Sequence, residues 1–341
     1  MKKGLVFGGS SFEHEISIVS AITLKGVLKQ ELDFIYCDGN RDFYLIEPKN
    51  MKAIYFSSGQ YKKSKFLTLK KGGFYIEGIF NKKIDADIFI NLIHGRDGED
   101  GRIASLFEFF DIKFIGPRLE ISALSYNKVL TKFLAQMAGV STLKYQILTK
   151  KDREISINYP IILKPARLGS SIGIEVIKDK SELEYGLDSA FDYDDLILVE
   201  PFINGIKEYN LAGCKVNGEI KISFLEEPSK KEILDFDQKY LNFSGNSNIK
   251  KAEISNELEL KFQNAFSKIY DCGFDGALIR CDFFEKDGEI YLNEINPNPG
   301  SLAYYLFDNF EEVLNLLAEN LPTYSKIPIE YKYIKSISVN K

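Results

Sequence analysis

Four polar side chains interrupt two apolar segments near the C-terminal end of the chain, and their types suit metal and anion binding. Arg280 and Asp282 lie in the first segment, and Glu294 and Asn296 lie in the second. The residues between the segments, 286–288, end in a glycine and are typical of a β-hairpin turn. Residues two apart lie on one face of a strand, so each pair shares a face.

Whether the two pairs share the same face depends on the length of the turn. A two-residue turn, Asp287-Gly288, would place Asp282 and Glu294 on opposite faces, whereas a three-residue loop ending in Gly288 would place all four side chains together. The second geometry predicts a cluster of carboxylate and amide oxygens that suits Mg²⁺ shared with nucleotide phosphates. The alternative is a half-exposed hairpin whose carboxylates face solvent.

A small, Gly- and Ser-rich stretch in the middle of the chain follows a predicted strand at 159–165. Lys164 lies near the end of that strand, and Gly169, Ser170 and Ser171 lie in the stretch 166–173 that leads to the next predicted strand. Small residues let backbone N–H groups approach phosphate oxygens, and hydroxyls add donors. The chain has no GxxxxGK[ST] sequence, so a Walker A loop is excluded. The stretch is longer than a hairpin turn requires, which favours phosphate binding.

Two polar loops follow predicted buried strands in the first third of the chain. One loop begins at Gly8 and includes Glu13, and the other begins at His94 and includes Glu99. Ligands of open α/β sheets bind at the carboxyl ends of strands, so these loops are candidates for one crevice. The first loop departs from GxGxxG, which makes a dinucleotide site an unsuitable interpretation. Two alternatives stay open: Ser10 and Glu13 also fit a capping box, and His94 can be a structural histidine.

Composition limits the function classes. The chain has 341 residues, enough for two or three domains, with 45% hydrophobic and 27% charged residues. A net charge of −5 gives no electrostatic reason to expect nucleic acid. The four cysteines have no metal-binding spacing, and no segment has the length and apolarity of a signal peptide or membrane span. We therefore expect a cytoplasmic protein without membrane or nucleic-acid partners.

The predicted elements indicate an α/β chain. A strand, a Gly-rich turn and a helix at about 15–29 open a doubly wound unit, and a boundary is expected after Gly116-Pro117. Further helices are predicted at 102–110, 180–192, 256–272 and 310–321. Another helix is predicted to extend to about Ala138 and to be ended by Gly139. Residues 226–252 are polar and lack periodicity, which predicts a disordered segment or a functional lid. The tail from 322 is expected to be loosely held.

Seven segments, in order along nearly the whole chain, closely resemble the D-alanine–D-alanine ligases of the ATP-grasp superfamily. They are Phe7 to Glu15, His94 to Gly101, Ser122 to Lys128, Lys164 to Gly173, Lys239-Tyr240, Arg280 to Asp282, and Asn293 to Gly300. The resemblance implies a three-domain ATP-grasp fold, α/β at its N-terminus and α+β in the ATP-grasp part. The implied N-terminal domain, 1–117, contains a doubly wound parallel sheet. The implied central ATP-grasp domain is 118–203, and the implied C-terminal ATP-grasp domain, 204–341, carries the metal site and the lid 226–252.

The resemblance also implies an activity, in which ATP drives the joining of two D-alanines through an acyl phosphate for peptidoglycan synthesis. Two Mg²⁺ or Mn²⁺ ions would bind through Asp282, Glu294 and Asn296. ATP would contact a set of residues from both ATP-grasp domains: Lys128, Lys164, Gly169, Ser170, Ser171, Glu200, Ile203, Glu208 and Lys239. The family is often dimeric, so a homodimer is expected.

The substrate residues follow from the same resemblance. Glu13 would hold the ammonium group of the first D-alanine, with His94 and Glu99 nearby. Arg280 and the backbone N–H of Gly300 would stabilise the oxyanion. Ser170, Lys239 and Tyr240 complete the implied catalytic set.

Three departures from the family pattern bear on these roles. Tyr126-Asn127-Lys128 stands where the family has Met-Asp-Lys, and the hinge from Glu200 to Glu208 is one residue longer than expected. After Gly300 the family has Met-Thr or Phe-Thr and then a serine for the second substrate's carboxylate. In this chain either Ser301 or Tyr305 would take that role. D-lactate or D-serine as second substrate, and a non-catalytic nucleotide-binding module, therefore stay as alternatives.

Overall fold

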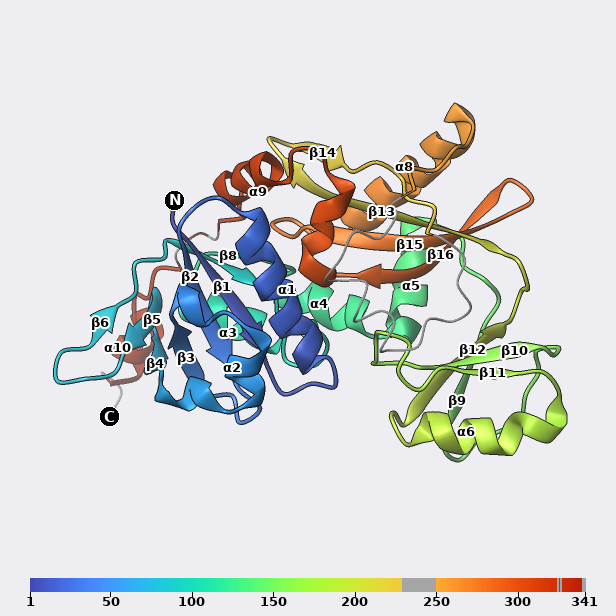
Figure 1. Ribbon diagram of the computed structural model, residues 1–341, viewed down its shortest axis with the longest axis horizontal. Helices are drawn as coiled ribbons and strands as arrows, with labels where there is room; N and C mark the ends of the chain where they lie inside the picture. The colour runs from blue at the N-terminus through green and yellow to red at the C-terminus, as the bar shows by residue number, and fades with distance from the viewer. Residues whose placement is uncertain (229–249, 324, 326, 339–341) are drawn as a thin grey trace.

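The computed structural model describes residues 1–228, 250–323, 325 and 327–338. Their strands form three separate sheets, and each sheet lies within one of the predicted domain ranges, whose limits stay a prediction. The largest sheet occupies the left half of the view in Figure 1, and the two four-stranded sheets lie at its lower and upper right.

The N-terminal sheet has eight strands in the order β6-β5-β4-β3-β2-β1-β7-β8. Its strands are β1 (Lys3–Gly8), β2 (Leu32–Cys37), β3 (Phe43–Ile46), β4 (Lys65–Lys70), β5 (Gly73–Ile76), β6 (Lys82–Lys83), β7 (Ile88–Asn91) and β8 (Phe114–Ile115). The four strands β2-β1-β7-β8 are parallel, as predicted, and β3 to β6 extend the sheet in antiparallel fashion. Because β1 and β7 are central and parallel, the loops after Gly8 and Asn91 emerge at the same edge.

Helices cover this sheet and connect it to the next one. They are α1 (His14–Val27), α2 (Ala53–Ser57), α3 (Arg102–Phe109), α4 (Leu119–Tyr126) and α5 (Lys128–Ala138), with 3₁₀ turns η1 (Pro48–Asn50) and η2 (Gln60–Lys63). The predicted end of α5 is confirmed, because Gly139 has a φ of 66° and its N–H bonds the last turn. Asn127 caps the start of α5, accepting hydrogen bonds from the N–H groups of Val129 and Leu130.

The second sheet is antiparallel, in the order β11-β10-β12-β9. It consists of β9 (Gln146–Thr149), β10 (Ile161–Pro165), β11 (Glu175–Ile177) and β12 (Leu196–Pro201), and η3 (Lys180–Glu182) leads into α6 (Leu183–Phe191). Figure 1 shows α6 covering one face of this sheet, where Leu183, Leu187 and Ala190 join its apolar core.

The third sheet is also antiparallel, in the order β14-β13-β15-β16. It consists of β13 (Lys207–Val216), β14 (Glu219–Ile222), β15 (Ile279–Lys286) and β16 (Glu289–Asn296), accompanied by α8 (Asn256–Tyr270), η4 (Gly300–Leu306) and α9 (Phe310–Glu319). The last described helix is α10 (Lys332–Ser338), which Figure 1 shows at the other end of the molecule, in the region of β4 to β6. The tail thus contains a short helix, α10, that the sequence did not predict. Both α8 and α9 pack against β13.

Several hydrogen bonds tie the part of the chain around the third sheet to the N-terminal sheet and its helices. The amide of Asn298 donates a hydrogen bond to the carbonyl of Ile93, at 2.9 Å, and the N–H of Gly116 donates one to the carbonyl of Gly276, at 3.0 Å. Asn298 is 2% exposed, so its bond is shielded from water. The first bond fixes the loop after β7 against the segment that follows β16, and the second joins the end of β8 to the segment before β15.

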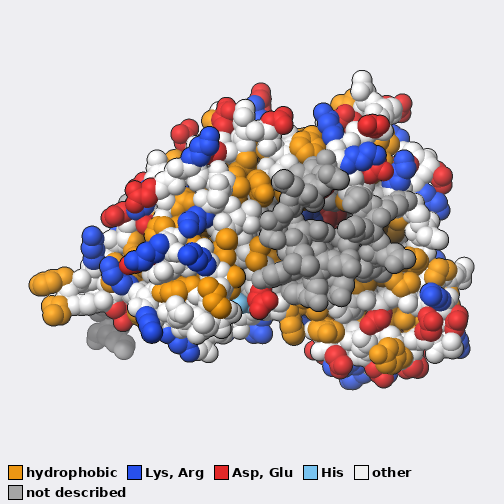
Figure 2. Space-filling view, in the orientation of Figure 1, with side chains coloured by type: hydrophobic (Ala, Val, Ile, Leu, Met, Phe, Trp, Pro, Cys, Tyr) orange, Lys and Arg blue, Asp and Glu red, His pale blue; other side chains and the backbone are white. Residues whose placement is uncertain are grey.

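The surface in Figure 2 mixes basic and acidic side chains, with hydrophobic ones at the tip of the loop between β5 and β6. At that tip Ile79 and Phe80 are 97% and 90% exposed. Within the described part of the chain, every helix is too short or too polar to span a membrane.

Candidate active site

The β15–β16 hairpin places all four of its predicted polar side chains on one face, but by a route that the sequence did not predict. The turn is the two-residue form, Asp287-Gly288, with φ angles of 55° and 79°. A bulge shifts the register, because Phe283 pairs with Leu292 whereas Asp282 pairs with Glu294. The three-residue loop expected for this arrangement is therefore wrong, and the extra residue in the bulge restores the shared face.

The bulge residue, Asn293, has a function of its own in the fold. Its side-chain oxygen accepts a hydrogen bond from Lys164 of the second sheet, at 2.9 Å. One irregularity thus aligns the hairpin's polar face and ties it to the neighbouring sheet. Sequence reasoning missed Asn293 because a bulge leaves no clear signal in a single sequence.

On the shared face, Arg280 and Asp282 form a two-bonded ion pair. The Arg280 nitrogens lie 2.6 and 2.8 Å from the Asp282 oxygens, and the side-chain amide of Asn296 donates to Asp282 at 3.0 Å. Burial raises the pKa of Asp282, although Arg280 opposes the shift, and the charge of Glu294 adds to it. Two carboxylates and an amide oxygen that lie together in this way are donors that suit a divalent cation.

Glu226, which sequence reasoning did not select, faces the same cluster. It is 8% exposed, accepts a hydrogen bond from Asn210 at 2.9 Å, and its charge is felt by Arg280 and Asp282. Burial raises its pKa, with Arg280 acting in the opposite direction. The predicted lid residues Lys239 and Tyr240, like the rest of 229–249, lie outside the described residues.

Glu13 from the N-terminal loop and Ser170 from the Gly/Ser-rich loop meet directly. The Ser170 hydroxyl donates to the Glu13 carboxylate at 2.6 Å, and a side chain at Gly169 would collide with the same carboxylate. Ser170 and Ser171 have positive φ angles of 55° and 62°, so this loop holds a strained backbone. The capping-box interpretation is wrong, because Glu13 itself occupies the N-cap position and makes no side-chain cap bond.

The electrostatics of Glu13 are unusual for a glutamate. Burial raises its pKa, and the nearby charge of Glu99 raises it further. The hydrogen bond from Ser170 and the charges of His94 and Lys128 lower the pKa by less. A buried carboxylate of this kind favours a bound cation, such as an ammonium group.

His94 lies behind Glu13, buried to 3% exposure. Its Nδ1 lies 3.4 Å from Glu99 Oε1, and its Nε2 lies 2.9 Å from the hydroxyl of Ser20 on α1. The predicted proximity of His94 and Glu99 is present, whereas Ser20 was not predicted.

Lys128, at the start of α5, spans the space between the second and third sheets. Its ammonium group donates to the carbonyl of Leu168 and lies 3.4 Å from Glu294. The capping bonds of Asn127 explain why asparagine can stand at this position in place of aspartate: either side chain offers the required oxygen.

A buried trio of charges lies where the second sheet meets α5. Glu200 is 1% exposed and binds Lys164 through one oxygen, at 2.7 Å, and Lys132 through the other. Burial would raise the pKa of Glu200, but the charges and hydrogen bonds of the two lysines outweigh it and lower that pKa. Lys132 was not among the predicted site residues, yet it is 2% exposed and takes part in this buried contact. Its spacing of one turn from Lys128 was the available signal.

The remaining predicted residues lie around the same region. Ile203 and Glu208 follow β12 and begin β13, and Glu208 pairs with Phe284 of the metal-site hairpin. Gly300 begins η4, the turn after β16. Tyr305 is partly buried beside Arg280. Desolvation raises the pKa of its hydroxyl to about 12; the charge of Arg280 opposes this shift, and those of Glu226 and Asp282 add to it.

Ser301 is 1% exposed, and its hydroxyl has no hydrogen-bond partner among the described residues. Its backbone N–H donates to Ser20 at 3.0 Å. The Ser301 hydroxyl is therefore covered by the fold, whereas Tyr305 borders Arg280.

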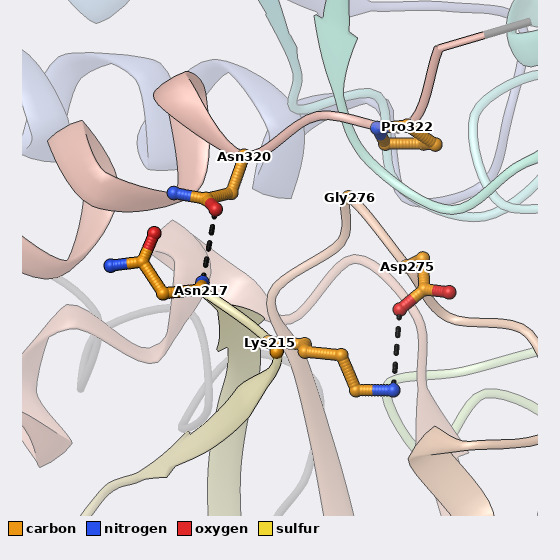
Figure 3. A pocket seen from close by; sticks show the side chains of 7 residues that line it. Lys215, Asn217, Asp275, Gly276, Asn320 and Pro322 are labelled. Carbon is orange, nitrogen blue, oxygen red and sulfur yellow. Dashed lines mark hydrogen bonds and ion pairs between the residues drawn. The ribbon is translucent and has the colours of Figure 1, made fainter.

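A separate pocket lies on the far side of the third sheet, with a cavity volume of about 160 Å³. Figure 3 shows Lys215 directed toward Asp275 and the backbone N–H of Asn217 bonded to Asn320. The bond to Asn320 joins the β13–β14 turn to the end of α9, and the ion pair of Lys215 joins β13 to the segment before β15. The polar groups of this pocket are therefore used to hold the fold together, and none of the predicted site residues lines it.

Two family models match the chain. The model described as D-ala D-ala ligase N-terminus matches residues 2–117, and the model described as D-ala D-ala ligase C-terminus matches residues 134–312. A D-alanine–D-alanine ligase of Campylobacter concisus is 65% identical over 99% of this chain and 98% of its own length. A D-alanine–D-alanine ligase of Campylobacter jejuni serotype O:2 is 55% identical over 100% of this chain and 99% of its own length.

Solved structures give the same result for the fold. The D-alanine–D-alanine ligase of Helicobacter pylori superposes with a TM-score of 0.85 at 49% identity, covering 95% of this chain and all of that one. The VanG D-Ala:D-Ser ligase of Enterococcus faecalis superposes with a TM-score of 0.73 at 25% identity, covering 94% of this chain and 98% of that one. Ligases with different second substrates thus share this architecture, so the fold alone does not select the second substrate.

Proposed function

Because the chain belongs to the D-alanine–D-alanine ligase family, we infer that it is an ATP-dependent ligase that joins two D-alanines for peptidoglycan synthesis. One observation carries this function to the residues: the bond between Glu13 and Ser170. It brings a carboxylate suited to an ammonium group against a loop suited to phosphates. An amino acid held by Glu13 would present its own carboxylate to the γ-phosphate of ATP.

The first step makes a reactive acyl group. A carboxylate is a poor acyl donor, so an oxygen of the first D-alanine attacks the γ-phosphorus of ATP, and ADP leaves. Phosphoryl transfer requires mainly positioning and neutralised charge. Lys128, Lys164 and the backbone of 169–171 supply these, while Glu200, Ile203 and Glu208 border the nucleotide.

We propose that Asp282, Glu294 and Asn296 hold two Mg²⁺ or Mn²⁺ ions. Bound ions would neutralise charge on the phosphates. The donor set fits this use, because Asp282 pairs with Glu294 across the hairpin and Asn296 bonds Asp282.

In the second step, the amine of the second D-alanine attacks the acyl carbon, and phosphate leaves. The tetrahedral oxyanion requires fixed donors, which we assign to Arg280 and the N–H of Gly300. We assign the second carboxylate to Tyr305 rather than Ser301, because Tyr305 borders Arg280 whereas the Ser301 hydroxyl is covered. Lys239 and Tyr240 stay predictions for the lid, which would keep water from the acyl phosphate.

The setting of the enzyme follows from the reaction. We propose that it acts on small molecules, ATP and D-alanine, in the cytoplasm. The homodimer that the resemblance implies stays a prediction.

The test is phosphate release from ATP and Mg²⁺ with D-alanine, L-alanine or no amino acid, with mass detection of the product. We expect phosphate release that depends on D-alanine, together with the D-alanyl dipeptide. A parallel panel with D-lactate and D-serine assigns the second substrate. Nucleotide binding without phosphate release under any condition would contradict the ligase and favour a non-catalytic nucleotide-binding module.

A further inference from the structure

The hydroxyl of Ser20 joins two parts of the site that are far apart in the sequence. Ser20 is 1% exposed and lies on α1. Its Oγ is 2.9 Å from His94 Nε2 and accepts a hydrogen bond from the Ser301 N–H at 3.0 Å. One side chain thus connects the histidine beside Glu13 with the turn that follows Gly300.

The bonding pattern assigns the protons along this chain. Glu99 is an acceptor when ionised, so His94 Nδ1 carries the proton that faces it. In the neutral imidazole, the other ring nitrogen, Nε2, accepts the hydroxyl proton of Ser20. The Oγ lone pairs of Ser20 stay free to accept the N–H of Ser301, so each donor in the chain has one acceptor.

The turn held by Ser20 is conformationally strained. Ser301, Leu302 and Ala303 have φ angles of 49°, 53° and 48°, three consecutive non-glycine residues in the left-handed region. Such a backbone persists when its surroundings hold it in place. The burial of Leu302 and Ala303 supplies part of this constraint, and Figure 1 shows η4 lying against α1, which carries Ser20.

We propose that Ser20 is a positioning residue that fixes the η4 turn, and with it the Gly300 N–H, relative to the first-substrate end of the site. This inference rests on the proposed ligase function. Gly300 directly precedes the residue that Ser20 holds, so a shift of Ser301 moves the oxyanion donor. Phosphorylation of the first D-alanine depends on other residues and continues without this alignment.

The consequence is a specific kinetic defect. Without the Ser20 hydroxyl, the acyl phosphate forms but is attacked less efficiently by the second amine, and water competes for it. The ratio of phosphate released to dipeptide formed rises above one. Loss of an oxyanion donor itself lowers kcat by about 10²–10³-fold. Misplacing that donor is a smaller change, and we expect a drop of roughly tenfold in dipeptide formation.

The experiment compares Ser20→Ala with Ser17→Ala in the full chain. Ser17 is a matched control, because it is a fully buried serine of the same helix with two hydrogen bonds, to Gly8 and Leu92, that do not reach η4. Each variant is assayed for phosphate, for dipeptide and for its melting temperature. Ser20→Cys, which keeps the volume, carries the test if the alanine variant does not fold.

The proposal expects a raised phosphate-to-dipeptide ratio in the Ser20 variants, an unchanged KM for ATP, and a ratio of one in Ser17→Ala. A ratio of one in every variant, or an equal rise in Ser17→Ala, would overturn it. If the unmodified enzyme forms no dipeptide, the proposed function fails instead. The two failures are therefore distinguishable.

Discussion

The buried trio of Lys132, Glu200 and Lys164 allows a sharp prediction about stability. Glu200 is the carboxylate that bonds both cations, and both lysine contacts are shielded from water. Removing its charge by Glu200→Gln leaves two buried ammonium groups without a counter-charge. Breaking a buried ion pair in this way destabilises a protein by about 3–5 kcal/mol.

Removing Lys132 has a different consequence, although it breaks the same contact. Lys132→Met leaves Glu200 paired with Lys164, so no uncompensated charge is created. The variant loses a hydrogen bond to a charged group, worth about 1.5–3 kcal/mol. It also avoids burying an ammonium group, an effect of several kcal/mol in the opposite direction. We therefore expect a change close to zero and well below that of Glu200→Gln.

The double variant separates this explanation from a general loss of packing. In Lys132→Met with Glu200→Gln, one of the two stranded cations is removed, so the double variant is more stable than Glu200→Gln alone. The coupling expected for groups in one network is about 0.5–3 kcal/mol.

Thermal melts of the four proteins without ligand give the required order. At about 2–4 °C per kcal/mol, Glu200→Gln lowers the melting temperature by roughly 6 °C or more. We expect the unmodified protein and Lys132→Met to share the highest melting temperature. The double variant melts at a lower temperature, and Glu200→Gln melts at the lowest. An equal loss in Lys132→Met and Glu200→Gln, or a double variant less stable than both, would refute the reasoning.

Three further predictions concern the catalytic face. Glu13→Gln abolishes dipeptide synthesis, because the substrate's ammonium group loses its carboxylate. The raised pKa of Glu13 means that its ionised form destabilises the fold, so the variant melts at a higher temperature than the unmodified protein at pH 8. This gain in melting temperature disappears as the pH falls below the raised pKa, where Glu13 is protonated. Asp282→Asn removes turnover at every Mg²⁺ concentration while circular dichroism stays unchanged; near-normal phosphate release would contradict the metal assignment. Tyr305→Phe raises the KM of the second D-alanine by roughly tenfold or more, the value of one hydrogen bond to a charged group, and leaves the KM of ATP unchanged.

The sequence predicted the elements of the site better than their contacts. Alternating apolar residues and an Asp-Gly turn identified the β15–β16 hairpin, because these signals are local. The bulge at Asn293 was not predicted. It depends on a contact with Lys164, which lies 129 residues earlier.

Burial of charges was the other source of error. The helix that carries Lys128 and Lys132 was predicted with its correct end at Gly139, but the sequence did not reveal that Lys132 is buried. The burial of Lys132 depends on Glu200, which comes from a strand 68 residues later. Periodicity within one helix cannot reveal an ion pair that is formed with another sheet.

The directions of the pKa shifts divide the buried acids of this site into two kinds. Glu200 has a lowered pKa, because two lysines of the protein outweigh its burial. Glu13 and Asp282 have raised pKa values, because burial outweighs the cations around them. A cation that binds beside Glu13 or Asp282 therefore meets a carboxylate that the protein leaves incompletely neutralised, and the interaction is favourable. A cation beside Glu200 gains little interaction energy, because two lysines already neutralise that carboxylate. This difference is the physical reason to assign the ammonium group to Glu13 and the metal ions to Asp282. Glu200 is instead assigned to holding its two lysines in place.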